Sequence, residues 1–261
     1  MAANENRPTE TVSLTSSLPA ILVLAAIWGL SIPLTKLGLE TLPPLTLTAL
    51  RFATALPPLF LLVMKQRLPL RALPRVAMLG VIGISVGQVA QTLGIEGTSA
   101  SIGAILSATI PVFVVVFAAF RLKQGVTLLQ MLGLFAAFSG IALVATGSGG
   151  EAASVARNSM AGIVWMLVSS VAIAFYYVWS VELTREHGTP LVAAWSTFFG
   201  LLALLPWTFW EISRVPVNLS LNGLAIAAYL GVFVTAAGLY LWLHLLRTVP
   251  AIVATSVQYL H

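Results

Sequence analysis

The chain has 261 residues, of which 59% are hydrophobic and only 8% are charged, and its formal net charge is +5. A soluble domain carries about a quarter charged residues, so this composition excludes an ordinary soluble protein and indicates a membrane protein. Cysteine and aspartate are absent, which excludes disulfides, thiolate metal ligands, a cysteine nucleophile and aspartate-based metal or phosphoryl-transfer motifs.

Apolar runs of about 20 residues, the length that crosses a bilayer as a helix, follow a polar stretch at 1–17. We predict eight complete membrane spans, near residues 18–36, 44–64, 75–95, 98–120, 127–146, 160–181, 190–210 and 222–246. A ninth begins at Pro250 and is cut at His261. Twelve helical residues rise only about 18 Å, and a bilayer core is about 30 Å thick. We therefore expect a C-terminally truncated sequence.

The positive charges are distributed unevenly between the predicted loops. With a cytoplasmic N-terminus, nine of the thirteen Lys and Arg residues lie in cytoplasmic segments, three lie outside, and Arg51 lies within a span. This distribution follows the positive-inside rule and predicts a multi-pass protein of the plasma (cytoplasmic, inner) membrane. The net charge therefore reflects membrane topology, and we expect no nucleic-acid partner.

The first predicted span carries polar residues on one helical face. Trp28, Ser31 and Thr35 are spaced i, i+3 and i+7, which brings an aromatic ring and two hydroxyls together. Pro33 cannot donate to the carbonyl of Gly29, so we expect a bend beside a cavity. The polar residues on this face are expected either to contact a solute or to pack against another helix with their hydroxyls bonded to their own backbone.

The second predicted span contains a charge. Arg51 lies seven residues after Pro44, about 10 Å into the membrane if the segment is helical. A cation at this depth costs a few kcal/mol unless it has a partner, so Arg51 is a candidate for the solute pathway or a gate. The alternative is that it snorkels to lipid phosphate or binds carbonyls at helix ends.

The third predicted span combines glycines with glutamines. Gly80, Gly83 and Gly87 form a stripe along which two helices can touch. Gln88 and Gln91 carry amides that need hydrogen-bond partners inside the bilayer. These two side chains indicate either a hydrated solute pathway or a hydrogen bond between helices.

The fourth predicted span is interrupted by small residues and a proline. Pro111 leaves the carbonyl of Ser107 without its usual donor, and such a group in lipid must face protein or a wet cavity. Ala100, Gly103 and Ser107 form a narrow face of small residues that admits a neighbouring backbone or a solute. We predict a helix break or hinge at Gly103 and Pro111, with Ser107 on the solute pathway.

The sixth predicted span contains the pair Tyr176 and Tyr177. Aromatic residues near a span end usually anchor the helix at the membrane interface. These two lie deeper than that, so the interpretation as cavity residues and the interpretation as anchors stay equally open.

The second half of the chain repeats part of the first. A shift of 151 residues aligns five positions: Leu79, Gly80 and Val81 with Leu230, Gly231 and Val232, then Gly87 with Gly238, and Ala100 with Ala251. We predict an all-α polytopic membrane protein with five-helix repeats at 18–147 and, incomplete, at 160–261. Ten transmembrane helices are expected, about nine of them present here. Because five is odd, the second copy is inverted, an architecture typical of secondary transporters.

Short motifs in the first two spans carry a family resemblance. Trp28 and Gly29 are followed by Lys36, and Pro44 by the pair Arg51 and Phe52. This pattern resembles EamA-type members of the drug/metabolite transporter superfamily, and so does the small-residue stretch in the fourth span. The resemblance covers essentially the whole chain. It implies a ten-span, inverted-repeat transporter of small organic solutes, without identifying the solute.

These observations predict a secondary transporter that moves a small organic metabolite, such as an amino acid, by alternating access. A non-transporting scaffold subunit is the alternative, and an intramembrane enzyme is a weaker one, because no nucleophile–base set or metal cluster is visible. We predict no catalytic residue, metal site or cofactor. The expected partners are a small-molecule solute and the lipid bilayer, and a homodimer is left open.

Overall fold

The computed structural model describes residues 23–24, 26–121, 132, 136, 139 and 159–248, with side chains as far as residue 243. All regular structure in these ranges is helical. Six segments are long and apolar enough to cross a membrane: Pro44–Leu61, Leu73–Glu96, Ala100–Arg121, Met160–His187, Thr189–Ile212 and Leu221–Leu243. They match six of the predicted spans. The predicted spans at 127–146 and from Pro250 lie outside the described residues, apart from three isolated positions.

In the first half, residues 26–29 are helical and α2 (Ser31–Gly38) follows after a turn at Leu30. The next helices are α3 (Pro44–Leu61), α4 (Leu73–Leu79), a π-helical segment η1 (Gly80–Val86), α5 (Gly87–Glu96), α6 (Ala100–Ser107) and α7 (Ile110–Arg121). The second half contains α10 (Met160–His187), α11 (Thr189–Ile212), α12 (Leu221–Tyr229), the π-helical η2 (Leu230–Ala237) and α13 (Gly238–Thr248).

Side-chain caps and a glycine fix several helix boundaries. The hydroxyls of Ser99, Ser159 and Ser220 accept a backbone N–H at the start of α6, α10 and α12. Each hydroxyl satisfies one of the donors that the first helical turn leaves without a partner. Gly188 joins α10 to α11 with a φ of 88°, a conformation that side-chain-bearing residues rarely adopt.

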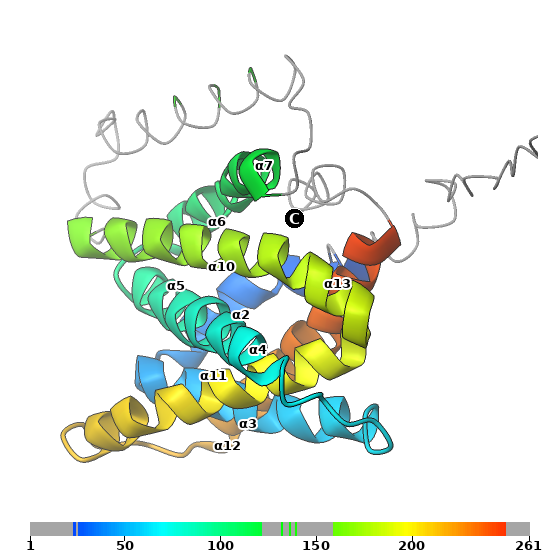
Figure 1. The fold of residues 1–261 in the computed structure, drawn as a ribbon. Helices are drawn as coiled ribbons and strands as arrows, with labels where there is room; N and C mark the ends of the chain where they lie inside the picture. Colours follow the sequence, from blue (N-terminus) through cyan, green and yellow to red (C-terminus); the bar gives the residue numbers. More distant parts are fainter. Residues whose placement is uncertain are drawn as a thin grey trace, which may run out of the picture.

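The helices of the two halves are interleaved rather than side by side. The helix α10 crosses over α5, while α11 packs on α3 and on η1 (Figure 1). The helix α3 in turn packs on α12 and η2. The main apolar core therefore mixes both halves, with fully buried Phe52 and Val76 in the same cluster as Tyr176 and Val192.

The two π-helical segments occupy corresponding positions in the two halves. The shift of 151 residues found in the sequence places Gly80–Val86 on Gly231–Ala237, which is η2 without its first residue. Each segment meets a helix of the other half closely. A Cβ on Gly80 would meet the carbonyl oxygen of Ser196 in α11, and one on Gly231 would meet that of Arg51 in α3. The recurrence in the sequence thus coincides with a recurrence in local structure and packing.

The helix breaks lie close to two of the predicted prolines. Residues 108–109 separate α6 from α7, whose second residue is Pro111, because a proline cannot continue the hydrogen-bond ladder. Pro33 lies in the first turn of α2, just after the turn at Leu30. Gly103 instead lies inside α6, where an added Cβ would come no nearer than 3.6 Å to a neighbouring atom. The break is therefore at 108–109 and not at Gly103.

Candidate functional site

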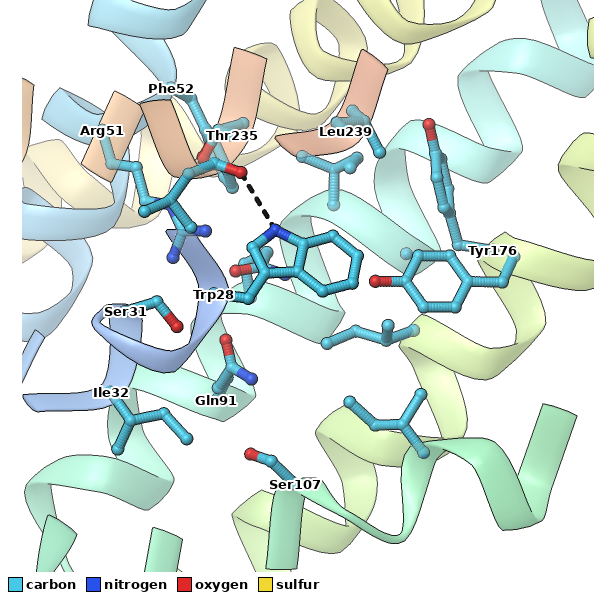
Figure 2. Close-up of a pocket in the computed structure, with 17 residues that line it drawn as sticks. Trp28, Ser31, Ile32, Arg51, Phe52, Gln91, Ser107, Tyr176, Thr235 and Leu239 are labelled. Atoms are coloured by element: carbon cyan, nitrogen blue, oxygen red, sulfur yellow. Dashed lines mark hydrogen bonds between the residues drawn. The ribbon is translucent and has the colours of Figure 1, made fainter. Parts of the chain in front are cut away.

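A cavity of about 80 Å³ with both polar and apolar side chains in its wall lies between the two halves, large enough for several water molecules or part of an organic solute. Its wall is built from both π-helical segments and from seven helices, namely α2, α3, α5, α6, α7, α10 and α13 (Figure 2). Of the residues predicted on the solute pathway, the wall contains Trp28, Ser31, Arg51, Gln88, Gln91, Ser107, Tyr176 and Tyr177. Thr35, also predicted there, is buried but does not line the cavity.

The aromatic side of the cavity is built around Trp28. Its indole N–H donates to the carbonyl of Val234 in η2, at 3.3 Å. The ring stacks on Tyr177 with 6.3 Å between centroids, and it packs against Trp242 at 5.3 Å. A Cβ on Gly238 would meet the indole nitrogen at 2.5 Å, so this rotamer of Trp28 requires a glycine there. The first span is thereby joined to α10, η2 and α13.

Arg51 brings a buried charge to the same cavity. Its side chain is only 8% exposed, and its Nε donates to the hydroxyl of Thr235 at 2.7 Å. That hydroxyl donates to the carbonyl of Leu230, five residues back, at 3.0 Å. The guanidinium therefore does not snorkel to the membrane surface. Because the described lining residues include no acidic side chain, the cavity carries a net positive charge.

Two polar oxygens in the wall are left without a hydrogen-bond partner among the described residues. Gln88 Oε1 and Ser107 Oγ are inaccessible to solvent and have no hydrogen-bond partner among the described residues. Ser107 as a whole is 7% exposed. Buried polar atoms in proteins are nearly always paired, so these two atoms can bind a group that the described residues do not supply. Gln91, labelled in Figure 2, lies three residues after Gln88 in α5 and also lines the cavity.

Tyr176 lines the cavity with its ring, and its hydroxyl already has a partner. The hydroxyl is 2.9 Å from Ser196 Oγ in α11, and both residues are buried. A Cβ on Gly83 would come within 2.7 Å of the Tyr176 ring. The predicted glycine stripe therefore allows η1 and α10 to touch at the cavity, as small residues do between membrane helices.

Sequence reasoning missed the role of Glu211, which is 7% exposed at the end of α11. Its carboxylate accepts the backbone N–H of Leu45 at 3.1 Å and that of Thr46 at 2.7 Å, and the Thr46 hydroxyl at 2.8 Å. The helix α3 begins at Pro43 and Pro44 with no cap of its own. The sequence does show that the first turn of α3 has no capping side chain of its own, but it does not show which distant residue supplies the cap.

Lys36 caps the C-terminal end of α5, where carbonyls rather than N–H groups lack partners. Its ammonium donates to the carbonyls of Ile95 at 2.7 Å, Glu96 at 3.0 Å and Thr98 at 2.6 Å. A cation is favourable at this end of a helix because the last carbonyls carry partial negative charge. Within the described ranges, His and Glu form no group of three that could hold a metal ion.

Secondary transporters bind their substrate between the two halves of such a helix bundle. Comparison with known proteins agrees. The model of the EamA-like transporter family matches residues 15–146 and 160–261. The chain therefore belongs to the EamA-like transporter family.

Individual relatives and a solved structure are consistent with this assignment. The chain is 27% identical to an uncharacterized transporter of Archaeoglobus fulgidus, over 84% of this chain and 76% of that protein. It is 27% identical to the inner membrane transporter YedA of Escherichia coli, over 93% and 78%. A probable terminal-alkyne amino-acid exporter of Streptantibioticus cattleyicolor is 27% identical, over 95% and 82%. A crystal structure with a TM-score of 0.66 and 17% identity, covering 94% of this chain and 85% of that one, shares the fold.

The family and these relatives define the class of the protein. It is a multi-pass membrane transporter rather than an enzyme, and its partners are a small-molecule solute and membrane lipid.

Proposed function

We propose that this protein is a secondary transporter that moves a small organic metabolite, such as an amino acid, across the plasma membrane by alternating access. The observation that carries the proposal is the cavity between the halves, which contains a buried cation and two unpaired oxygens. The Streptantibioticus relative, named as an amino-acid exporter, supports a metabolite of this class. Trp28, Ser31, Gln88, Gln91 and the two tyrosines would form the solute pathway.

The proposed architecture is an inverted repeat of two five-helix units, ten membrane helices in all, with a cytoplasmic N-terminus. The two separate matches to the family model support two units. So do the corresponding π-helical segments η1 and η2, each packed through a glycine on a helix of the other half. In such repeats, one half rocks against the other around a fixed central site.

The proposed hinges are places where the regular hydrogen-bond ladder is already interrupted. The break between α6 and α7 lies beside Ser107, and η1 and η2 both line the cavity. π-Helical segments and proline breaks are common sites of bending in helices. Rearrangement at these three places would open the cavity first to one side of the membrane and then to the other.

Counterflow in proteoliposomes tests the proposal. Vesicles loaded with a mixture of unlabelled amino acids are expected to accumulate a labelled one when they contain the protein. Replacing Arg51 by Leu is expected to abolish this accumulation while the variant still inserts in the membrane. Uptake at the wild-type level in that variant would refute the assignment of Arg51, and absence of flux of any metabolite would favour the scaffold alternative.

A further inference from the structure

We propose that the cavity recognises a carboxylate: the transported solute is an organic acid or a zwitterion whose carboxylate binds the terminal nitrogens of Arg51. A hydrogen-bond donor on the same solute, such as an ammonium or a hydroxyl group, would bind Gln88 Oε1 and Ser107 Oγ. This inference rests on the proposed function and adds to it the chemistry of the solute.

The hydrogen bonding of Arg51 leaves the relevant end of its guanidinium available. Of the five N–H groups, Nε–H is used by Thr235, and this is the one hydrogen bond that the guanidinium makes within the described part of the chain. The four N–H groups on the two terminal nitrogens remain, in a planar fork that matches the two oxygens of a carboxylate. Arg51 lines the cavity, as Ser31 does (Figure 2).

Thr235 acts as a positioning residue for this fork. Its hydroxyl accepts from Arg51 and donates to Leu230, so both of its hydrogen-bonding roles are fixed. The donation to a carbonyl five residues back follows the π-helical geometry of η2. The position of the cation is therefore set by a segment of the opposite half of the protein.

The charge balance favours an anion. The ion pairs in the described ranges are Arg121 with Glu182 and His187 with Glu186, and neither involves Arg51. The buried Glu211 is already held by the first turn of α3. A buried charge without a counter-ion is strongly unfavourable, so a solute carboxylate would supply what the described protein lacks.

The two unpaired oxygens indicate which chemical group the solute carries besides its carboxylate. Gln88 Oε1 can only accept, and Ser107 Oγ can accept or donate, so both can bind a donor group without supplying a negative charge. Because the described wall contains no carboxylate, a solute that carries only positive charge meets repulsion from Arg51 and no compensation. The expected solutes are therefore amino acids and hydroxy acids, and diamines are expected to be excluded.

A purely structural role for Arg51, as a strut between α3 and η2, makes a different prediction. Loss of a strut weakens the binding of every solute alike, whereas loss of an anion site removes only the preference for carboxylates. The test therefore compares solutes that differ in this one group.

The experiment uses pairs of matched probes on the purified protein in detergent, with ionic strength held constant by sodium chloride. The pairs are L-leucine with L-leucinamide, lactate with lactamide, and benzoate with benzamide, and putrescine is the cationic probe. Thermal stabilisation gives an apparent Kd, because a ligand that binds the folded state raises its stability. We expect at least one carboxylate to bind tenfold or more tightly than its amide, the scale of a charge-assisted hydrogen bond.

Variants then assign the preference to its source. Arg51→Gln is expected to abolish it, and Arg51→Lys, which keeps the charge but loses the fork, to reduce it without abolishing it. Thr235→Val keeps the shape of the side chain without the hydroxyl and is expected to weaken carboxylate binding severalfold, whereas Thr235→Ser restores it. Arg121→Gln, at an exposed ion pair away from this cavity, is the control and is expected to leave the preference intact.

The outcomes separate the two proposals. If amides bind as tightly as carboxylates, or if Arg51→Gln keeps the preference, the inference is overturned while transport stands. If no probe binds and none moves in proteoliposomes, the proposed function fails together with the inference.

Discussion

Replacing Glu211 by alanine is expected to destabilise the protein more than replacing an exposed glutamate by alanine does. The substitution leaves the backbone N–H groups of Leu45 and Thr46, now held at 3.1 and 2.7 Å, without an acceptor at the start of α3. Loss of a helix cap costs about 0.5–2 kcal/mol, and loss of a partly buried charge at a helix terminus up to about 2 kcal/mol. We therefore expect a loss of about 2–4 kcal/mol in the free energy of unfolding.

Thermal unfolding of the detergent-purified variant by intrinsic fluorescence measures this loss. For a chain of this size, about 1 kcal/mol corresponds to about 2–4 °C in Tm, so we expect a decrease of about 5–15 °C. Glu211→Gln keeps one acceptor oxygen, and its Tm is expected to lie between that of the wild type and that of Glu211→Ala.

The matched control for this substitution is Glu182→Ala. Glu182 also bonds at 2.8 Å, to Arg121, but both side chains are more than 40% exposed. Exposed ion pairs contribute about 0–1 kcal/mol, so its Tm is expected to change by no more than about 4 °C. Equal losses in the two variants would show that the carboxylate of Glu211 does not hold α11 to α3.

Three further predictions, the first with a matched control, follow from contacts in the structure. Gly231→Ala is expected to lower the yield of folded protein or its stability by about 3 kcal/mol, whereas Gly103→Ala, with its nearest neighbour at 3.6 Å, is expected to leave both unchanged in expression and Tm measurements. Tyr176→Phe removes the bond to Ser196 and is expected to cost about 1 kcal/mol, read as a Tm decrease of about 2–4 °C; no decrease would contradict that bond. Lys36→Met is expected to accelerate amide hydrogen exchange at the end of α5, and unchanged exchange there would rule out capping by its ammonium.

Much of the cavity wall could be predicted because polar residues inside apolar spans are few. Arg51, Gln88 and Gln91 stand out in runs that are otherwise apolar, and a polar group inside a membrane needs a partner wherever it lies. Thr35 shows the limit of this reasoning. It shares the helical face of Trp28 and Ser31 but is buried outside the cavity wall, because helical spacing gives the face of a residue and not how far along that face a cavity extends.

The sequence by itself determined the membrane class, six of the described spans and the residues that had to avoid lipid, since these depend on the composition and spacing of residues along one segment. Only the tertiary structure decided that Glu211 caps α3 and that Thr235 holds Arg51, 184 residues away. It also decided that η1 and η2 are π-helical and meet the opposite half. These features depend on which helices become neighbours, and helix periodicity reports the face that a residue occupies but not the partner that this face will meet.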